Sequence, residues 1–444
     1  MQPIPKLRNE PALAEHLPAL APHEAIVEAN RCLFCYDAPC THACPTHIDI
    51  PRFIKKIATG NLIGSARTIL EANILGATCA RVCPVQELCE GACVLGSSHR
   101  PIQIGRLQRY ATDAVDPACV LRSGTPNGRK VAVIGAGPAG LACAGYLAQH
   151  GVEVTIFERR PLAGGLSTYG IIALREPAEV ALAEVEMIRR LGVAIREGVE
   201  FGRDIDGPEV RANFDAVFIS VGLGATPALG IPGEEYIVDG IEYIERSKLD
   251  TGPIRIGQKV VVVGAGNTAI DCATIARRLG AERVTMVYRR TDREMTAYAH
   301  EYDFVKREGV DVRFLAQPVR VLTNAGAVIG LECASVQLGA ADESGRPAPK
   351  TIPGSEFVID ADQIVRAIGQ QKPAVAALLG LETEKGFIRV NSHYETSAPE
   401  IFAGGDCIRA KGAASTVMAV QDGKLAARAI ERHLTAKGAQ ANNG

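Results

Sequence analysis

The stretch KVAVIGAGPAGLACAGYLAQHGVEVTIFERR, from Lys130 to Arg160, decides the fold of this chain. An apolar run is followed by G-x-G-x-x-G, a helical pattern, a break at a glycine and a second apolar run. This order predicts a strand, a tight turn, a helix and a second strand, as in a dinucleotide-binding α/β unit. The glycines let backbone N–H groups approach a pyrophosphate at the N-terminus of the helix, where the helix dipole favours anions.

A second passage, KVVVVGAGNTAIDCATIARRLGAERVTMVYRR, begins at Lys259 and repeats this design with G-x-G-x-x-A. The two passages differ where their second strand ends. Glu158 ends the first, where a carboxylate can accept hydrogen bonds from the adenosine ribose hydroxyls. Arg289 and Arg290 end the second, and their charges, with that of nearby Arg293, suit a 2′-phosphate better than two free hydroxyls. The sequence therefore predicts two nucleotide sites of different preference.

A third element, IFAGGDC from Ile401 to Cys407, predicts a strand and a Gly-Asp turn, and the residues from Ser415 to Leu434 predict a helix after it. Such an element can return a carboxylate and a helix N-terminus to the first nucleotide site. We therefore expect the first nucleotide domain to be split, with the second inserted into it.

The bulk composition is that of a folded chain: 444 residues, 47% apolar, 22% charged and a formal net charge of −2. This length predicts two or three domains, and the charge gives no indication of nucleic acid or of an acidic membrane surface. The uncharged run from Val131 to Ala148 is long enough for a membrane span, but its glycines favour strand, turn and helix. Without a secretory signal, we expect a cytoplasmic protein with reduced thiols.

Two sets of four cysteines precede the first nucleotide motif. Cys32, Cys35, Cys40 and Cys44 follow C-x2-C-x4-C-x3-C-P, and Cys79, Cys83, Cys89 and Cys93 follow in CARVCPVQELCEGAC. Disulfides, zinc and iron–sulfur clusters are all possible. Zinc favours compact C-x2-C pairs, of which this region has one, whereas iron–sulfur clusters accept longer spacings and a final Cys-Pro. We therefore favour iron–sulfur clusters.

From about residue 126 onward the chain resembles flavoproteins with two dinucleotide-binding domains, in which FAD occupies the first site and NAD(P)H the second. The resemblance implies FAD contacts from Gly135, Gly137, Ala139, Gly140, Glu158, Gly165, Leu166, Arg175, Gly405, Asp406 and Thr416. It implies nicotinamide-nucleotide contacts from Gly264, Ala265, Gly266, Asn267, Thr268, Arg289, Arg290, Ala367, Ile368 and Gly369. Many relatives carry a close-spaced redox disulfide. Here Cys143, Cys272, Cys333 and Cys407 are isolated and are expected to be buried small residues.

The N-terminal region resembles the iron–sulfur domain shared by dihydropyrimidine dehydrogenase, the small subunit of glutamate synthase and related electron-bifurcating subunits. The resemblance implies two [4Fe–4S] clusters. One would be held by Cys32, Cys35, Cys40 and Cys93, and the other by Cys44, Cys83, Cys89 and Gln108. Cys79 is then a bystander.

Three details favour the dihydropyrimidine dehydrogenase branch: the five residues between Cys83 and Cys89, the run LGATCARVCP and the pair Leu107–Gln108. One detail departs from the family, because Ile171–Ile172 replaces an Ile-Pro before Arg175. No pyrimidine-binding barrel follows the last predicted helix, so we expect the two-subunit form, with an FMN- and iron–sulfur-containing catalytic partner. The resemblance to that form favours NADH, against the arginine charges. No residue of this chain is expected to be catalytic.

The predicted fold is α/β, with two Rossmann-like dinucleotide-binding domains preceded by an α-helical iron–sulfur domain. The expected limits are 1–125 for the iron–sulfur domain, 126–250 and 373–444 for the two parts of the FAD domain, and 251–372 for the NAD(P) domain. The predicted function is electron transfer from NAD(P)H through FAD and the clusters to the partner's FMN, which interconverts uracil or thymine and their 5,6-dihydro forms. Alternatives are a glutamate synthase small subunit, a bifurcating or ferredoxin-linked NADPH oxidoreductase subunit, and a non-catalytic redox sensor.

Overall fold

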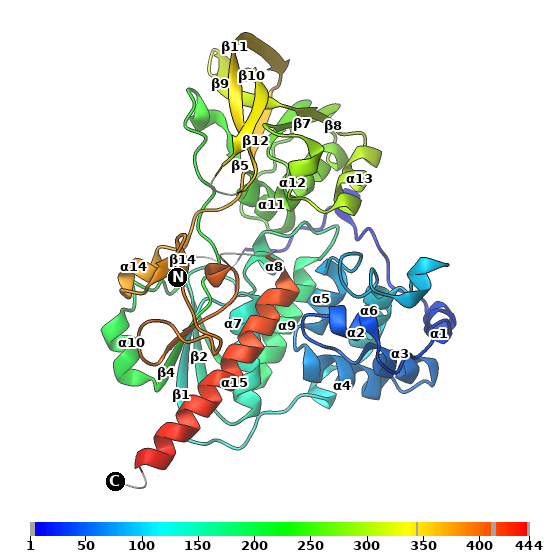
Figure 1. The fold of residues 1–444 in the computed structure, drawn as a ribbon, viewed down its shortest axis with the longest axis vertical. Helices are drawn as coiled ribbons and strands as arrows, with labels where there is room; N and C mark the ends of the chain where they lie inside the picture. Colours follow the sequence, from blue (N-terminus) through cyan, green and yellow to red (C-terminus); the bar gives the residue numbers. More distant parts are fainter. Residues whose placement is uncertain (1–4, 343–344, 410–413, 442–444) are drawn as a thin grey trace.

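The computed structural model describes residues 5–342, 345–409 and 414–441. A helical N-terminal region lies beside two α/β lobes, and the long helix α15 (Thr416–Ala441) runs along the lower lobe (Figure 1). Among the described residues, no helix is long and apolar enough to cross a lipid bilayer.

The first lobe is built on a five-stranded parallel sheet with the order β15-β4-β1-β2-β3. The strands are β1 (Lys130–Ile134), β2 (Glu153–Glu158), β3 (Ala194–Glu197), β4 (Ala216–Ile219) and β15 (Ile401–Ala403). β15 pairs with β4 although the whole second lobe lies between them in sequence. The predicted split of the first nucleotide domain is therefore confirmed.

Four helices of the first lobe are placed around this sheet. They are α7 (Pro138–Gln149), α8 (Leu166–Tyr169), α9 (Ala178–Arg190) and α10 (Gly207–Asn213). α7 is apolar on most of its surface and is buried between the sheet and α15. A Cβ on Gly423 of α15 would stand 2.1 Å from the carbonyl oxygen of Ala139, so these two helices approach more closely than any larger residue would permit. The lobe is completed by α14 (Val375–Leu378), β13 (Thr383–Glu384) and β14 (Phe387–Ile388).

The second lobe carries another five-stranded parallel sheet, with the order β5-β12-β6-β7-β8. Its strands are β5 (Val238–Asp239), β6 (Lys259–Val263), β7 (Arg283–Tyr288), β8 (Asp311–Phe314) and β12 (Gln363–Arg366). Its helices are α11 (Gly240–Lys248), α12 (Asn267–Arg278) and α13 (Ala299–Arg307). An antiparallel sheet of β9 (Ala316–Asn324), β10 (Ala327–Ala341) and β11 (Pro347–Asp360) stands at its far end (Figure 1).

β5 enters the second sheet before residue 251, where the sequence analysis began the NAD(P) domain. Val238 pairs with Val365 of β12, and Tyr243 and Ile244 of the following helix are buried in the core of the second lobe. Two-residue strands carry almost no periodicity, which explains why the sequence gives no signal there. The domain limits themselves stay predictions.

The N-terminal region is a small helical bundle. Its helices are α1 (Pro22–Asn30), α2 (Pro39–Ala43), α3 (Ile50–Ala58), α4 (Leu62–Ala72), α5 (Gly76–Val82) and α6 (Ile104–Asp113). Gly60 takes a φ of +76° at the turn between α3 and α4, where one helix ends and the next begins. Phe53, Ile54 and Leu107 are buried at the centre of the bundle.

Candidate functional site

A cavity of about 890 Å³ lies between the carboxyl ends of the first sheet and the second lobe. This is the edge of a parallel sheet where ligands bind in α/β proteins. Twelve of the predicted nucleotide contacts line it: Gly135, Gly137, Ala139, Glu158, Gly165, Leu166, Arg175, Gly405, Asp406 and Thr416 of the first predicted site, and Asn267 and Thr268 of the second.

The glycines of the first motif, together with Gly165, leave room for a ligand in this cavity. Gly135 has a φ of +101° and Gly165 a φ of +59°, which side chains rarely adopt. A Cβ on Gly137 would meet no atom nearer than 3.9 Å and would occupy the cavity, whereas one on Gly140 would stand 2.1 Å from the Gly135 carbonyl oxygen. Gly137 therefore fits close approach of a pyrophosphate, and Gly140 serves the packing of α7 against β1.

Glu158 closes one end of the cavity. Its two carboxylate oxygens accept hydrogen bonds from the backbone N–H groups of Ala136 and Arg160, both at 2.8 Å. Burial raises the pKa of Glu158 above its ordinary value, while these two N–H groups lower it. The side chain is thus fixed beside the glycine turn, where an adenosine ribose would lie if the first motif holds FAD.

The return strand β15 brings a second carboxylate to the cavity. Asp406 follows β15 and lines the cavity with Thr416, the first residue of α15. Burial raises the pKa of Asp406. Behind it, Asp422 accepts hydrogen bonds from the N–H of Gly405 at 3.1 Å and from the hydroxyl of Tyr394 at 3.1 Å. Asp422 thus fixes the Gly-Asp turn from within α15, a role that no sequence motif indicates.

Arg175 joins the two lobes across the cavity. Its guanidinium forms an ion pair with Asp271 of α12 at 2.9 Å and another with Glu301 of α13. Burial raises the pKa of Asp271 to about 6, against the lowering effect of Arg175. Neither partner was predicted from the sequence. An aspartate on the apolar face of NTAIDCA was the signal that could have indicated a buried pair.

The second motif has the same turn geometry as the first. Gly264 has a φ of +136°, and a Cβ there would stand 2.1 Å from the carbonyl oxygen of Ala367. The loop 367–369 and the second glycine turn, which includes Ala265 and Gly266, are thereby brought together, and Ile368 is partly exposed beside them. Asn267 also accepts a hydrogen bond from the N–H of Tyr298 at 3.2 Å, and Tyr298 lines the cavity.

The two arginines at the end of β7 have different surroundings. Arg290 is buried, forms an ion pair with Asp342 at 2.6 Å and donates to the carbonyl oxygen of Pro347 at 2.9 Å. Arg289 is exposed. The guanidinium of Arg290 is thus already engaged by the antiparallel sheet, and Arg289 is the one presented to solvent.

The N-terminal cysteines gather in two groups. Cys32, Cys35, Cys40 and Cys93 line one small cavity. In the other group Cys83 lies close to Cys79, Cys89 and Cys44, and a hydrogen bond with Cys79 together with burial raises the pKa of Cys83. Within the part of the chain that the structure describes, no three His, Cys, Asp or Glu side chains are arranged around one metal ion.

Gln108 is buried, and its side-chain nitrogen donates to the carbonyl oxygen of Gly76 at 2.8 Å. It therefore contacts the start of α5, whereas Cys79 lies in the middle of that helix and Cys83 follows its last residue. Cys143, Cys272, Cys333 and Cys407 are each fully buried, as expected for small core residues.

The cysteine group of Cys83 adjoins the large cavity. Val82 and Pro84, the two neighbours of Cys83, line that cavity with the residues of the first nucleotide motif. The cavity thus runs from Asn267 and Thr268 in the second lobe, past the first motif, to the wall that carries Cys83.

The fold and this site define an oxidoreductase that binds a flavin and a nicotinamide nucleotide next to an iron–sulfur domain. Residues 129–423 match the family described as pyridine nucleotide-disulphide oxidoreductase. Residues 9–118 match the domain described as dihydropyrimidine dehydrogenase domain II, 4Fe-4S cluster. The chain belongs to the pyridine nucleotide-disulphide oxidoreductase family and is an NAD(P)-dependent flavin and iron–sulfur oxidoreductase.

Named relatives cover most of the chain. It is 35% identical over 424 residues to the NAD-dependent dihydropyrimidine dehydrogenase subunit PreT of Escherichia coli, with 95% of this chain and 97% of that one covered. It is 36% identical to the glutamate synthase [NADPH] small chain of Halomonas elongata, covering 93% and 91%. It is also 36% identical to the NADP(+)-dependent formate dehydrogenase subunit beta of Moorella thermoacetica, over 89% of this chain but only 60% of that one.

Solved structures share the fold of the two lobes. FprA from Mycobacterium tuberculosis matches with a TM-score of 0.58 at 18% identity, over 70% of this chain and 86% of that one. Thioredoxin reductase from T. acidophilum matches with a TM-score of 0.53 at 21% identity, over 69% and 99%. These matches confirm the predicted pair of Rossmann-like domains.

Proposed function

We propose that this chain is the electron-transfer subunit of a dihydropyrimidine dehydrogenase and works in a heteromer. The observation that carries the proposal is the single cavity that joins the second nucleotide motif, the first motif and the wall beside Cys83. A bound FAD would supply the chemistry that converts a hydride, received as an electron pair, into single electrons. The residues that line the cavity would bind and orient the flavin and would exclude water from it.

The proposed cofactor set is FAD, NAD(P)H and two [4Fe–4S] clusters. Gly137 leaves space for the pyrophosphate, and Glu158 and Asp406 lie where carboxylates can hold the ribose and flavin ends. One cluster would be held by Cys32, Cys35, Cys40 and Cys93, which share a cavity. The other would be held by Cys44, Cys83 and Cys89, with Gln108 as the proposed fourth ligand.

The partner is proposed to be an FMN- and iron–sulfur-containing subunit that reduces uracil or thymine, or runs in reverse. Support comes from the spacing between Cys83 and Cys89 and from the PreT relative, whose length this chain covers almost completely. A glutamate synthase small subunit is the second candidate, supported by a relative of similar identity and coverage.

Anaerobic affinity purification from native extract tests the proposal. We expect an FMN- and iron–sulfur-containing protein to co-purify, and the complex to oxidise NAD(P)H only when uracil or thymine is added. A large glutaminase-containing partner and no response to uracil would establish the second candidate instead. A purified protein that contains iron–sulfur clusters but does not oxidise NAD(P)H in the presence of artificial acceptors would indicate a redox sensor.

For the nicotinamide nucleotide we propose that Arg289, and not Arg290, decides between NADH and NADPH, because Arg290 is already paired with Asp342. The variant Arg289→Ala should raise the KM for NADPH and leave that for NADH unchanged. An equal effect on both cofactors would contradict this role.

A further inference from the structure

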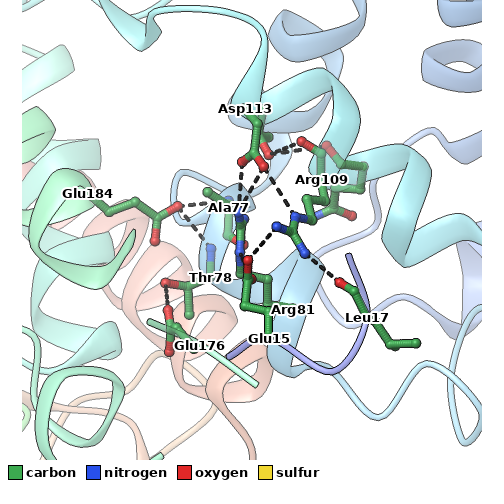
Figure 2. A network of polar contacts seen from close by, with 11 residues as sticks. Glu15, Leu17, Ala77, Thr78, Arg81, Arg109, Asp113, Glu176 and Glu184 are labelled. Atoms are coloured by element: carbon green, nitrogen blue, oxygen red, sulfur yellow. Dashed lines mark hydrogen bonds and ion pairs between the residues drawn. The ribbon is translucent and has the colours of Figure 1, made fainter. Parts of the chain in front are cut away.

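A cluster of buried ionisable groups lies between the N-terminal bundle and the first lobe, and Figure 2 shows two of its members, Glu176 and Glu184. Glu176, Glu184 and Lys248 are each at least 94% buried, as is Thr78 between the two carboxylates. Charged side chains are almost never buried so deeply unless they are paired. None of them has a role in the site described above.

Two of these carboxylates hold helix α5, which leads to Cys83. One carboxylate oxygen of Glu184, on α9, accepts hydrogen bonds from the backbone N–H groups of Ala77 at 2.8 Å and Thr78 at 3.3 Å. The hydroxyl of Thr78 donates to Glu176 (Figure 2). Both glutamates belong to the first lobe, so they fix the first turn of α5 against that lobe.

The charges of this cluster do not balance. Lys248 faces Glu176 and donates to the carbonyl oxygen of Ser167 at 2.6 Å, so its ammonium offsets one carboxylate. Arg81 also faces Glu176, but it is already paired with Glu15 at 3.1 Å and Asp113 at 2.8 Å. Asp271 and Glu179 also face Lys248, and Asp271 is paired with Arg175. Two buried carboxylates thus share one ammonium.

A proton on Glu184 would restore the balance. Its second carboxylate oxygen is buried without a hydrogen-bond partner among the described residues, and the side chain lines a cavity of about 930 Å³ between α9 and the N-terminal bundle. Burial, with Glu176 nearby, raises the pKa of Glu184 to about 8. A protonated carboxyl group at this position carries no charge that needs balancing, whereas an ionised one would stay buried without a counter-charge.

We propose that Glu184 carries a proton in the resting protein, and that its ionisation places an unbalanced negative charge against α5 that lowers the reduction potential of the centre held by Cys83. Glu184 acts through α5 and is a positioning residue, not a catalytic one. On ionisation, the proton of the Glu184 carboxyl group passes to the solvent. The effect on the potential rests on the proposed function, since it requires an iron–sulfur centre at Cys83.

Two measurements on the holoprotein test this. First, infrared spectra of protein labelled with carboxyl-¹³C glutamate should show the carbonyl stretch of a protonated carboxyl at pH 7, lost above pH 9 and absent in Glu184→Gln. Second, redox titrations followed by electron paramagnetic resonance should show one iron–sulfur midpoint falling as pH rises through 8. The fall should be no steeper than about 59 mV per pH unit, which is a tenfold change for one electron.

The variant Glu184→Gln keeps an oxygen for the two N–H groups and should remove the fall in potential. The control Glu186→Gln lies on the same helix and lines the same cavity, but its side chain is 55% exposed, and it should behave like the wild type. A wild-type fall that persists in Glu184→Gln, or an infrared band independent of Glu184, would overturn the inference. If no iron–sulfur signal exists, the proposed function and the effect on the potential fail, and the infrared band alone decides whether Glu184 holds the proton.

Discussion

At the scale of single residues, buried carboxylates that accept hydrogen bonds from backbone N–H groups fix the cofactor cavity and the helix α5 beside it. Glu158, Glu184 and Asp422 each accept such hydrogen bonds, and burial raises the pKa of all three. Removal of any of them leaves buried donors unsatisfied, at a cost of about 1–3 kcal/mol for each donor. Their loss should therefore lower stability, and the loss of Glu158 or Asp422 should also weaken cofactor retention.

Replacement of Glu158 should weaken flavin binding. In Glu158→Ala the N–H groups of Ala136 and Arg160 lose their acceptor, and the glycine turn loses its fixed position. We expect the ratio of flavin to protein after gel filtration to fall severalfold, and to fall likewise in Asp406→Ala. Glu153→Gln, at the exposed start of the same strand, serves as the control. Unchanged flavin in both test variants would disprove the assignment of the first site.

The proton on Glu184 should also appear in the pH dependence of stability. The unfolded chain releases this proton near the ordinary glutamate pKa, whereas the folded chain keeps it up to about pH 8. The folded state therefore binds more protons between these values, and its free energy of unfolding falls as the pH rises from about 5 to 8. The Tm of Glu184→Gln relative to wild type should thus be higher at pH 8 than at pH 6. A difference that does not change with pH would contradict this.

At the scale of elements, two glycines three residues apart have different roles. Gly140 lets α7 approach β1, and Gly137 leaves space in the cavity. In Gly140→Ala the new Cβ would meet the Gly135 carbonyl oxygen at 2.1 Å, which should lower stability by roughly 1–3 kcal/mol. In Gly137→Ala the new Cβ meets no protein atom nearer than 3.9 Å, so the Tm without flavin should barely change while flavin content falls. Full flavin content in Gly137→Ala would exclude close approach at that position.

Elements with strong local signals could be predicted from the sequence. Both strand–turn–helix units, the return strand at Ile401 and the helix after it follow from periodicity and glycine spacing. The pairing of Arg175 with Asp271 and Glu301 could not be predicted, because it joins segments about 100 residues apart and each residue alone is typical of a surface. The burial of Arg290 was hidden for the same reason, since its partner Asp342 directly follows β10 of the antiparallel sheet.

At the scale of the whole molecule, Arg175 connects the first lobe to the second lobe. In Arg175→Gln the carboxylates of Asp271 and Glu301 would stay in place without their cation, which costs about 3 kcal/mol for a largely buried pair. We expect a lower Tm and slower bleaching of the flavin absorbance by NAD(P)H in stopped-flow experiments. Arg190→Gln removes an exposed arginine and is the control. Bleaching at the wild-type rate would show that the pair does not align the lobes.

The return of β15 to the first sheet has a consequence for how the protein is made. When the ribosome has delivered β4, the sheet still lacks the strand that borders it and the helix that covers α7. The segment from Ile219 to Ile401 must be translated first, which takes roughly 10–35 s at 5–20 residues per second. During that interval the inserted second lobe can complete its own sheet, while the apolar edge of the first sheet at β4 stays unpaired. Chaperone occupancy on the nascent chain should therefore be concentrated in this window.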